Sequence, residues 1–156
     1  MIANELAQAM QKDGRTLYGV ANRTYENAVA FAKKSMKLEK SLLRTYRIFF
    51  EDDDVDIVYI STPHNTHIQY LREALKHGKH VLCEKSITLN AKELEEAKQL
   101  AEENGVVLAE AMTIYHMPLY KKLQEVIRSG KLGKLCMAQM NFGSYKEYDM
   151  QNRFFN

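Results

Sequence analysis

The sequence predicts an α/β protein whose parallel sheet is covered by helices on both faces. Apolar runs of strand length alternate with stretches of helical period along most of the chain. The run VDIVYIS (55–61) is continuous and rich in β-branched residues, which is typical of a central parallel strand buried on both faces. Glycines follow two of the helical stretches, where a helix would end.

The first third of the chain is predicted as helix, strand and helix. Residues 2–10 form a helix with Leu6, Ala9 and Met10 on one face, and TLYGVAN (16–22) is a short buried strand. Thr24 opens the next helix, over 24–34. Residues 35–50 fit a helical period, but RTYRIFF (44–50) also fits a strand, so both assignments stay open.

The remaining elements carry clearer signals. After the strand at 55–61, TPHN (62–65) breaks the pattern, and a helix ending at Gly78 turns four apolar residues inward: Ile68, Leu71, Ala74 and Leu75. KHVLCE (79–84) is the next strand, followed by a helix over 90–105 with Asn90 as its N-cap and by a strand over 106–112. Residues 118–130 form an amphipathic helix, and 135–145 alternate like a strand with one covered face.

Composition indicates an ordinary globular protein. The 156 residues are 46% hydrophobic and 27% charged, and the net charge of +2 is too small to predict a nucleic-acid or membrane partner. A basic cluster over 33–47 lacks interleaved aromatic residues and is interpreted as a solvated helix face. The opening MIANELAQAM lacks the regions of a signal peptide, and two cysteines make no disulfide framework, so we expect a cytoplasmic protein.

The histidines do not predict a metal site. The His64/His67 pair opens a helix, whereas the His77/His80 pair spans a helix end and the next strand. Neither pair is completed to four ligands by carboxylates or cysteines at the spacing that zinc sites use.

Two long stretches carry a resemblance to a known family. DVDIVYISTPHNTHIQYLREALKHGKHVLCEK (54–85) and GVVLAEAMTIYHMPLYKKLQEVIRSGKLGK (105–134) resemble the Gfo/Idh/MocA family of NAD(P)-dependent oxidoreductases. The Thr-Pro turn, the Glu-Lys turn and the spacing between them carry the likeness. It implies a Rossmann domain over 1–130 and, over 131–156, the start of an α/β open-sheet domain for substrate and dimer contacts, hence a homo-oligomer.

The resemblance also implies an incomplete Rossmann-type sheet. Family members begin with a strand and a G-x-G-x-x-G/A turn that holds the cofactor pyrophosphate. Ala3 matches the last small position of that motif, and no glycine-rich turn precedes it. We therefore expect a chain truncated at both ends, a gap between the strands at 16–22 and 55–61, and weakened cofactor binding.

Glu84 and Lys85 match the catalytic signature of the family. The resemblance implies that Lys85 is a general acid/base beside the nicotinamide, and the carboxyl end of a parallel strand would place it, partly buried, in the cofactor crevice. Glu84 would oppose or orient the ammonium group. The alternative is a surface ion pair at a strand end. Ser86 departs from the family's proline, which commonly follows a cis bond, and this leaves the direction of Lys85 open.

The cofactor residues implied by the resemblance lie at the ends of two strands. Asn22 and Arg23 follow the strand at 16–22, where an arginine fits the 2′-phosphate of NADP better than NAD; the alternative is an ordinary residue before a helix. The turn after 55–61 resembles the nicotinamide-ribose loop, against an alternative of simple turn chemistry. The full predicted cofactor set is Ala3, Asn22, Arg23, Ser61, Thr62, Pro63, Asn65, His67, Glu84 and Lys85.

Tyr115 and His116 are candidate substrate contacts, with packing as the alternative. The predicted function is hydride transfer between NADP(H) and a small-molecule secondary alcohol, such as a polyol, a sugar or a dihydrodiol. We expect no turnover from these 156 residues alone. The alternative is a non-catalytic, truncated or degenerate module that acts through self-association along residues 135–145.

Overall fold

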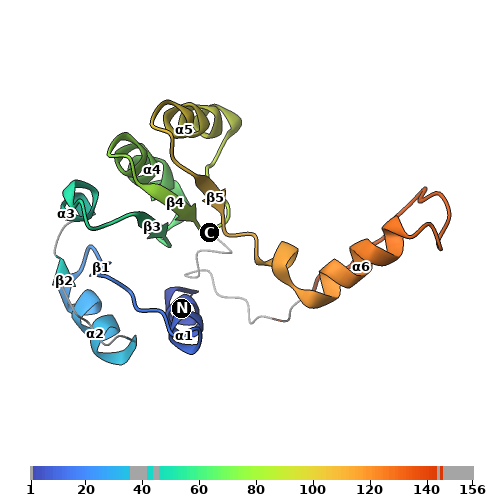
Figure 1. Cartoon of the computed structure of the whole chain (residues 1–156), viewed down its shortest axis with the longest axis horizontal. Coiled ribbons are helices and arrows are strands. Elements are labelled where there is room, and N and C mark those ends of the chain that lie inside the picture. The colour runs from blue at the N-terminus through green and yellow to red at the C-terminus, as the bar shows by residue number, and fades with distance from the viewer. Residues whose placement is uncertain (1, 36–41, 44–45, 144, 146–156) are drawn as a thin grey trace. The chain divides into compact units, whose positions relative to one another are not determined.

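A computed structural model describes residues 2–35, 42–43, 46–143 and 145, and the chain divides into two compact units, Met1–Met112 and Thr113–Asn156 (Figure 1). In the first unit the elements are α1 (Ile2–Lys12), β1 (Val20–Ala21), α2 (Tyr25–Ser35), β2 (Leu42–Leu43), α3 (Tyr46–Glu51), β3 (Ile57–Ile60), η1 (His64–Thr66), α4 (His67–Lys76), β4 (His80–Cys83), α5 (Ala91–Glu103) and β5 (Leu108–Glu110). The second unit holds η2 (Thr113–His116) and α6 (Pro118–Arg128). The domain boundary after residue 130 stays a prediction.

All strand pairs in the described part of the chain are parallel, as the sequence predicts. β3, β4 and β5 form one sheet in that order, and β1 pairs with β2 in a second sheet. No pairing joins β1 to β3 among the described residues, which is where a gap was expected. The prediction that residues 55–61 form a central strand buried on both faces is wrong, because β3 lies at the edge of its sheet. Accordingly, Ile57 is 66% exposed.

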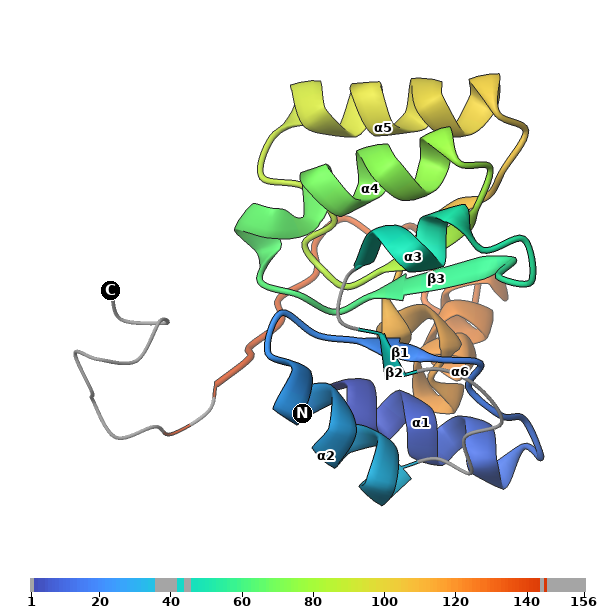
Figure 2. The same cartoon turned by 90° about the vertical axis from the view of Figure 1, so that its left-hand side faces the viewer.

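Helices α4 and α5 pack against the β3-β4-β5 sheet, and Figure 2 shows both helices on the same side of β3. In α4 the predicted inward residues Leu71, Ala74 and Leu75 are fully buried, because their spacing places them on one helix face. Gly78 adopts a φ of 69° just beyond the helix, in the left-handed region that glycine tolerates. In α5 the Asn90 side chain accepts the backbone N–H of Glu93 at 3.0 Å, confirming the predicted cap.

The early elements differ in detail from the predictions. In α1 the buried residue is Ala7, whereas Ala9 is exposed, because positions three and four apart (Ala3, Leu6, Ala7 and Met10) share the inward side. The strand predicted over 16–22 is reduced to Val20–Ala21. In the ambiguous stretch at 35–50, residues 46–50 belong to helix α3, so the strand alternative for 44–50 is wrong where the chain is described, and the short strand β2 lies just before it. Residues 36–41, 44 and 45 lie outside the described part.

In the second unit, α6 forms as predicted but buries none of its side chains, and Leu119 is 78% exposed. The strand predicted over 135–145 is wrong for the residues described there, which carry no strand. An alternating pattern needs a neighbouring strand to supply hydrogen bonds, and the described residues of this segment have none. In the part of the chain that the structure describes, every helix is too short or too polar to cross a bilayer.

Candidate functional site

The carboxyl ends of β3, β4 and β5 meet at one edge of their sheet, because the three strands are parallel. Ile60 pairs with Cys83, and Cys83 pairs with Glu110, so the segments that follow these residues start side by side. The turn at Ser61 and Thr62 and the Glu84-Lys85 pair therefore lie at neighbouring strand ends. This is the edge at which open α/β sheets bind their ligands.

Glu84 is held in the structure by β3. Its backbone N–H donates to the carbonyl of Ile60 at 2.8 Å, and its carboxylate accepts the phenol hydroxyl of Tyr59 at 2.5 Å. Burial, reinforced by this hydrogen bond to Glu84, raises the pKa of Tyr59 above its usual range. None of the ion pairs among the described residues joins Glu84 to Lys85. The surface ion pair that the sequence leaves open is therefore not formed there.

Lys85 is exposed, which corrects the expectation that it is partly buried. The peptide unit that follows, between Ser86 and Ile87, is hydrogen-bonded to His67 and Glu110. No hydrogen bond or ion pair of its ammonium group occurs among the residues that the structure describes. The peptide bond between Lys85 and Ser86 is cis, although serine follows.

His67 lies behind this edge and not in the open. Its side chain is fully buried; Nδ1 lies 2.9 Å from the carbonyl oxygen of Ser86, and Nε2 lies 2.9 Å from that of Thr62. Both ring nitrogens thus face backbone carbonyl oxygens. Direct contact of this ring with a cofactor stays a prediction, and the structure gives the ring a different set of partners.

The turn after β3 forms the local hydrogen bonds that turn chemistry predicts. The Thr66 hydroxyl donates to the carbonyl of Pro63 at 2.6 Å, and the oxygens of the Thr66 and Thr62 hydroxyls are 2.9 Å apart. Pro63 and Asn65 are exposed at the surface of this turn. Its role as a ribose loop stays a prediction, and its backbone is already ordered by its own side chains.

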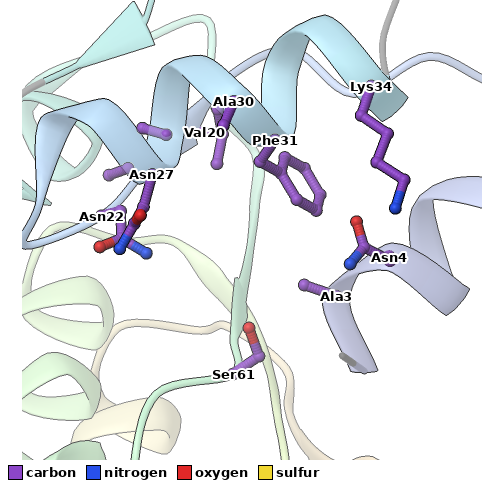
Figure 3. A pocket seen from close by; sticks show the side chains of 11 residues that line it. Ala3, Asn4, Val20, Asn22, Asn27, Ala30, Phe31, Lys34 and Ser61 are labelled. Atoms are coloured by element: carbon purple, nitrogen blue, oxygen red, sulfur yellow. The ribbon is translucent and has the colours of Figure 1, made fainter.

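A pocket of about 410 Å³ brings three of the predicted cofactor residues together (Figure 3). Ala3 comes from α1, Asn22 follows β1, and Ser61 follows β3. The remaining lining residues are Asn4, Val20, Ala21, Asn27, Ala28, Ala30, Phe31 and Lys34. The strand ends and the first turn of α1 therefore open into one cavity.

Sequence reasoning missed the contribution of α2 to this pocket. Asn27, Phe31 and Lys34 all line it, and Figure 3 shows them along the same helix. Their spacing of four and three residues places them on one helix face, a signal that was available in the sequence. As a member of the basic cluster over 33–47, Lys34 is expected on a solvated helix face. Lys34 is exposed, which agrees with that interpretation, and it also lines the pocket.

Asn22 and Arg23 lie where β1 passes into α2. The side-chain carbonyl of Asn22 accepts the N–H of Thr24 at 2.9 Å, and the Thr24 carbonyl accepts the N–H of Asn27 at 3.1 Å, which starts the helix. Arg23 is exposed beside the pocket-lining Asn22 and is not itself part of the lining. Its position at the end of β1 agrees with the prediction, and its ligand stays a prediction.

The candidate substrate residues belong to the second unit, in η2. Tyr115 is 54% exposed, and its ring packs edge-on against that of Tyr120 with centroids 5.7 Å apart. Tyr115 thus makes a packing contact, which was the alternative to its role as a substrate contact. His116 is exposed, and substrate contact stays a prediction for both residues. The described residues contain no group of three or more metal-ligating side chains able to hold a metal ion.

Comparison with known families decides the identity of this fold. A sequence model of the Gfo/Idh/MocA oxidoreductase family, described as having an NAD-binding Rossmann fold, matches residues 1–112. That match covers the whole first unit. The chain belongs to the Gfo/Idh/MocA family.

Characterised members of the family are similar over most of the chain. D-xylose 1-dehydrogenase (NADP(+)) from Hypocrea jecorina is 37% identical over 140 residues, which cover 81% of this chain and 36% of that enzyme. Trans-1,2-dihydrobenzene-1,2-diol dehydrogenase from mouse is 32% identical over 146 residues, covering 92% and 43%. The chain thus spans about two fifths of the length of these Gfo/Idh/MocA relatives.

Solved structures give the same result. The 3-ketoreductase KijD10 from Actinomadura kijaniata, crystallised with NADP, superposes with a TM-score of 0.69 at 28% identity, covering 77% of this chain and 37% of that one. A probable dehydrogenase from Thermotoga maritima gives a TM-score of 0.70 at 26% identity, covering 77% and 36%. The α/β fold predicted from the sequence is confirmed.

Proposed function

We propose that this chain carries the NADP-binding and acid–base part of a dehydrogenase. Its substrate would be a secondary alcohol in a sugar, polyol or dihydrodiol. The observation that carries the proposal is Lys85, an exposed lysine with an unpaired ammonium among the described residues, at the carboxyl end of the central strand β4. Hydrogen bonds hold the residues on either side of Lys85, so its Cα position is fixed while its side chain is free to meet a ligand.

The residues present fit a dinucleotide in its general chemistry. A pocket of about 410 Å³ is within the size range of small-molecule sites and opens at the strand ends. Ala3 in the first turn of α1 leaves room for a close approach to backbone N–H groups, which attract phosphate. Lys34 adds a positive charge to the lining. When bound, NADP(H) would supply or accept the hydride.

Lys85 would move the proton that accompanies hydride transfer. In the oxidation direction, the amine of Lys85 would take the proton of the substrate hydroxyl, the carbon that bears this hydroxyl would give its hydride to the bound NADP(+), and a carbonyl would result. In the reduction direction, the ammonium returns a proton to the carbonyl oxygen that receives the hydride. The names of two relatives, a xylose dehydrogenase and a dihydrodiol dehydrogenase, support an alcohol of this class.

Arg23 supports NADP over NAD. It follows the second residue of β1 by two positions, where a guanidinium pairs with a 2′-phosphate and a carboxylate would bind free ribose hydroxyls. The relative from Hypocrea jecorina carries NADP(+) in its name, and KijD10 was crystallised with NADP.

Titration of NADPH and NADH against the 156-residue chain, followed by nicotinamide fluorescence or calorimetry, tests the proposal. We expect weak binding, because these residues contain no glycine-rich turn, with NADPH preferred over NADH. Arg23→Ala is expected to remove that preference, and Arg15→Ala, which changes another exposed arginine, serves as the control. Undetectable NADPH binding at millimolar concentration would reject the proposal.

The same preparation tests the acid–base role. We expect turnover of polyols or dihydrodiols to be absent or very slow in these 156 residues. Any turnover that is detected should vanish in Lys85→Met, a loss far larger than any loss of NADPH affinity. Turnover that survives this substitution would remove Lys85 from the chemistry.

A second candidate is a non-catalytic module that self-associates through residues 135–145. The exposure of three apolar side chains favours it: Met137 is 85% exposed, Met140 86% and Phe142 101%. The described residues there form no strand, so association through a sheet edge is not supported. Sedimentation that shows only a monomer at all concentrations would exclude this candidate.

A further inference from the structure

We propose that His67 and Glu110 act together as positioning residues, which grip one peptide unit, Ser86–Ile87, from two sides and so fix the backbone that presents Lys85. The inference rests on the proposed function, in which Lys85 meets the substrate. Neither of the two side chains contacts Lys85 itself among the hydrogen bonds described.

Both polar groups of that peptide unit are held by side chains. Its carbonyl oxygen, on Ser86, lies 2.9 Å from Nδ1 of His67, and its N–H, on Ile87, donates to Oε1 of Glu110 at 2.9 Å. His67 is the first residue of α4 and Glu110 is the last residue of β5, respectively 19 and 23 positions away along the chain. A loop peptide exposed to solvent would satisfy these groups with water, so two protein partners on one unit limit its rotation.

The other flank of Lys85 is held as well. The N–H of Glu84 donates to the Ile60 carbonyl at 2.8 Å, and its carboxylate accepts the Tyr59 hydroxyl at 2.5 Å. Lys85 thus stands between two fixed peptide units while its own side chain remains exposed. This arrangement fixes the Cα atom of Lys85 and leaves the amine at the end of its side chain free to move.

His67 lies between this loop and the neighbouring turn. The ring is fully buried, and its second nitrogen, Nε2, faces the carbonyl of Thr62 at 2.9 Å. A carbonyl oxygen only accepts hydrogen bonds, so a proton must lie on Nδ1 for the ring to hold Ser86. Simple packing of a ring in the core makes no such demand on the tautomer. The protonation of Nδ1 is therefore a signature of the positioning role.

Nitrogen-15 NMR of the unmodified chain, with labelled histidine, tests this signature without any variant. We expect the buried ring to show a proton on Nδ1 and a coupling or nuclear Overhauser contact that assigns it to His67. A neutral ring with its only proton on Nε2 would overturn the assignment of His67.

Hydrogen exchange at the Ile87 amide tests Glu110. We expect Glu110→Ala to speed this exchange about tenfold, because one charge-assisted hydrogen bond is lost. Glu110→Gln keeps an acceptor oxygen at the same place and should restore most of the protection. Amides in the middle of α5 should exchange as in the unmodified chain in both variants. Equal exchange at Ile87 in all three proteins would overturn the role of Glu110.

A double-mutant cycle tests whether the two residues act on the same unit. His67→Phe keeps a ring of similar shape and removes both nitrogens. With one bond lost the peptide turns and weakens the other, so the double variant should speed exchange at Ile87 by less than the product of the two single effects. A strictly multiplicative result would mean two independent contacts and would overturn the joint role. If His67→Phe does not fold, the Nδ1 proton seen by NMR still tests His67, and the comparison of Glu110→Ala with Glu110→Gln still tests Glu110.

These measurements need no cofactor, so they separate the two proposals. Protection that changes as expected in a chain that does not bind NADPH would keep the positioning role and reject the proposed function. In a chain with detectable turnover, Glu110→Ala should lower kcat and leave NADPH binding unchanged, because it acts through Lys85.

Discussion

The two sheets of the first unit differ in what they bury. The β3-β4-β5 sheet and its helices enclose a core with large side chains, among them Phe50, Leu71 and Leu75. Around the β1-β2 sheet, the buried side chains among those described are alanines: Ala7, Ala28 and Ala32. A buried leucine contributes about 1.5–3 kcal/mol of transfer free energy, whereas a methyl group contributes less than 1 kcal/mol. The β3-β4-β5 sheet is therefore stabilised by far more apolar contact than the β1-β2 sheet.

This difference separates two tasks of the candidate site. The Lys85 loop stands on the heavily packed sheet, where Glu84, His67 and Glu110 fix its backbone. The pocket is lined mostly by the lightly packed half, which comprises α1, β1, α2 and β2. Among the described residues, Ser61 is the lining residue that comes from the β3 side. A ligand in this pocket would add contacts where the protein has few, so its binding should stabilise the lightly packed half.

The largest expected effect comes from the core of the packed sheet. Leu71→Ala should lower the free energy of unfolding by about 2–5 kcal/mol, because Leu71 is fully buried and leaves a cavity. Leu71→Met, which nearly conserves volume, should cost less than about 1.5 kcal/mol. Chemical denaturation measures both. Phe31→Ala in the lightly packed half should cost clearly less than Leu71→Ala, and an equal loss would break the comparison.

The next effect concerns local opening of the two sheets. The amide of Val81 in β4, which donates to the Val107 carbonyl at 2.8 Å, should exchange at least about tenfold more slowly than that of Val20 in β1. NADPH at saturating concentration should protect Val20 more than Val81, since the pocket is lined by Val20. Amide exchange followed by NMR gives both rates. Equal protection in the two sheets would contradict the assignment of the lightly packed half.

A smaller effect tests the hydrogen bond beneath the loop. Tyr59→Phe removes the donor to Glu84 and should cost about 1 kcal/mol at neutral pH. The folded-state pKa of Tyr59 lies above its ordinary value of 10.0, so its contribution is complete below pH 10 and is lost as pH rises towards the raised value. Denaturation at pH 7 and at pH 11 should therefore show a gap between the two proteins that shrinks at the higher pH. A gap that widens would reverse the sign of the linkage.

The smallest effect is expected for the ion pair between α4 and α5. Arg72 Nε lies 2.6 Å from Glu96 Oε1 and its NH2 group 2.7 Å from Oε2, and the hydrogen bond from Arg72 lowers the pKa of Glu96. Because the folded-state pKa of Glu96 is lowered, the ion pair stabilises the fold fully above the ordinary glutamate pKa, and this stability is lost as the pH falls through the lowered folded-state pKa. Both side chains are partly exposed to solvent, so Glu96→Gln should lower the melting temperature only slightly at pH 7, and by less as the pH falls into the acid range. Thermal unfolding at pH 7 and in the acid range checks this.

The helices of the packed half could be predicted from the sequence because their signals are local. Leu71, Ala74 and Leu75 repeat with the helical period, and Asn90 caps the helix three residues before Glu93. The position of Glu84 and Lys85 at a strand end follows from the same kind of pattern. These features depend on residues within about one turn of each other, so no knowledge of the neighbours in space is needed.

The partners of the site could not be predicted in the same way. Tyr59 and Glu84 are 25 positions apart, and Glu110 and Ile87 are 23 apart. Which of these side chains meet depends on the order and register of the strands. The exposure of Lys85, the burial of His67 and the edge position of β3 have the same origin.

The sequence by itself determined the alternation of strands and helices, the parallel sheet, the family resemblance and the location of the Glu84-Lys85 turn. Tertiary structure alone decided that β3 lies at the edge of its sheet among the described residues, that Glu84 accepts a hydrogen bond from Tyr59 and forms no ion pair with Lys85, and that α2 lines the pocket. The physical reason is that periodicity and capping are set by neighbours along the chain. Hydrogen-bond partners and burial are set by segments that meet only after folding.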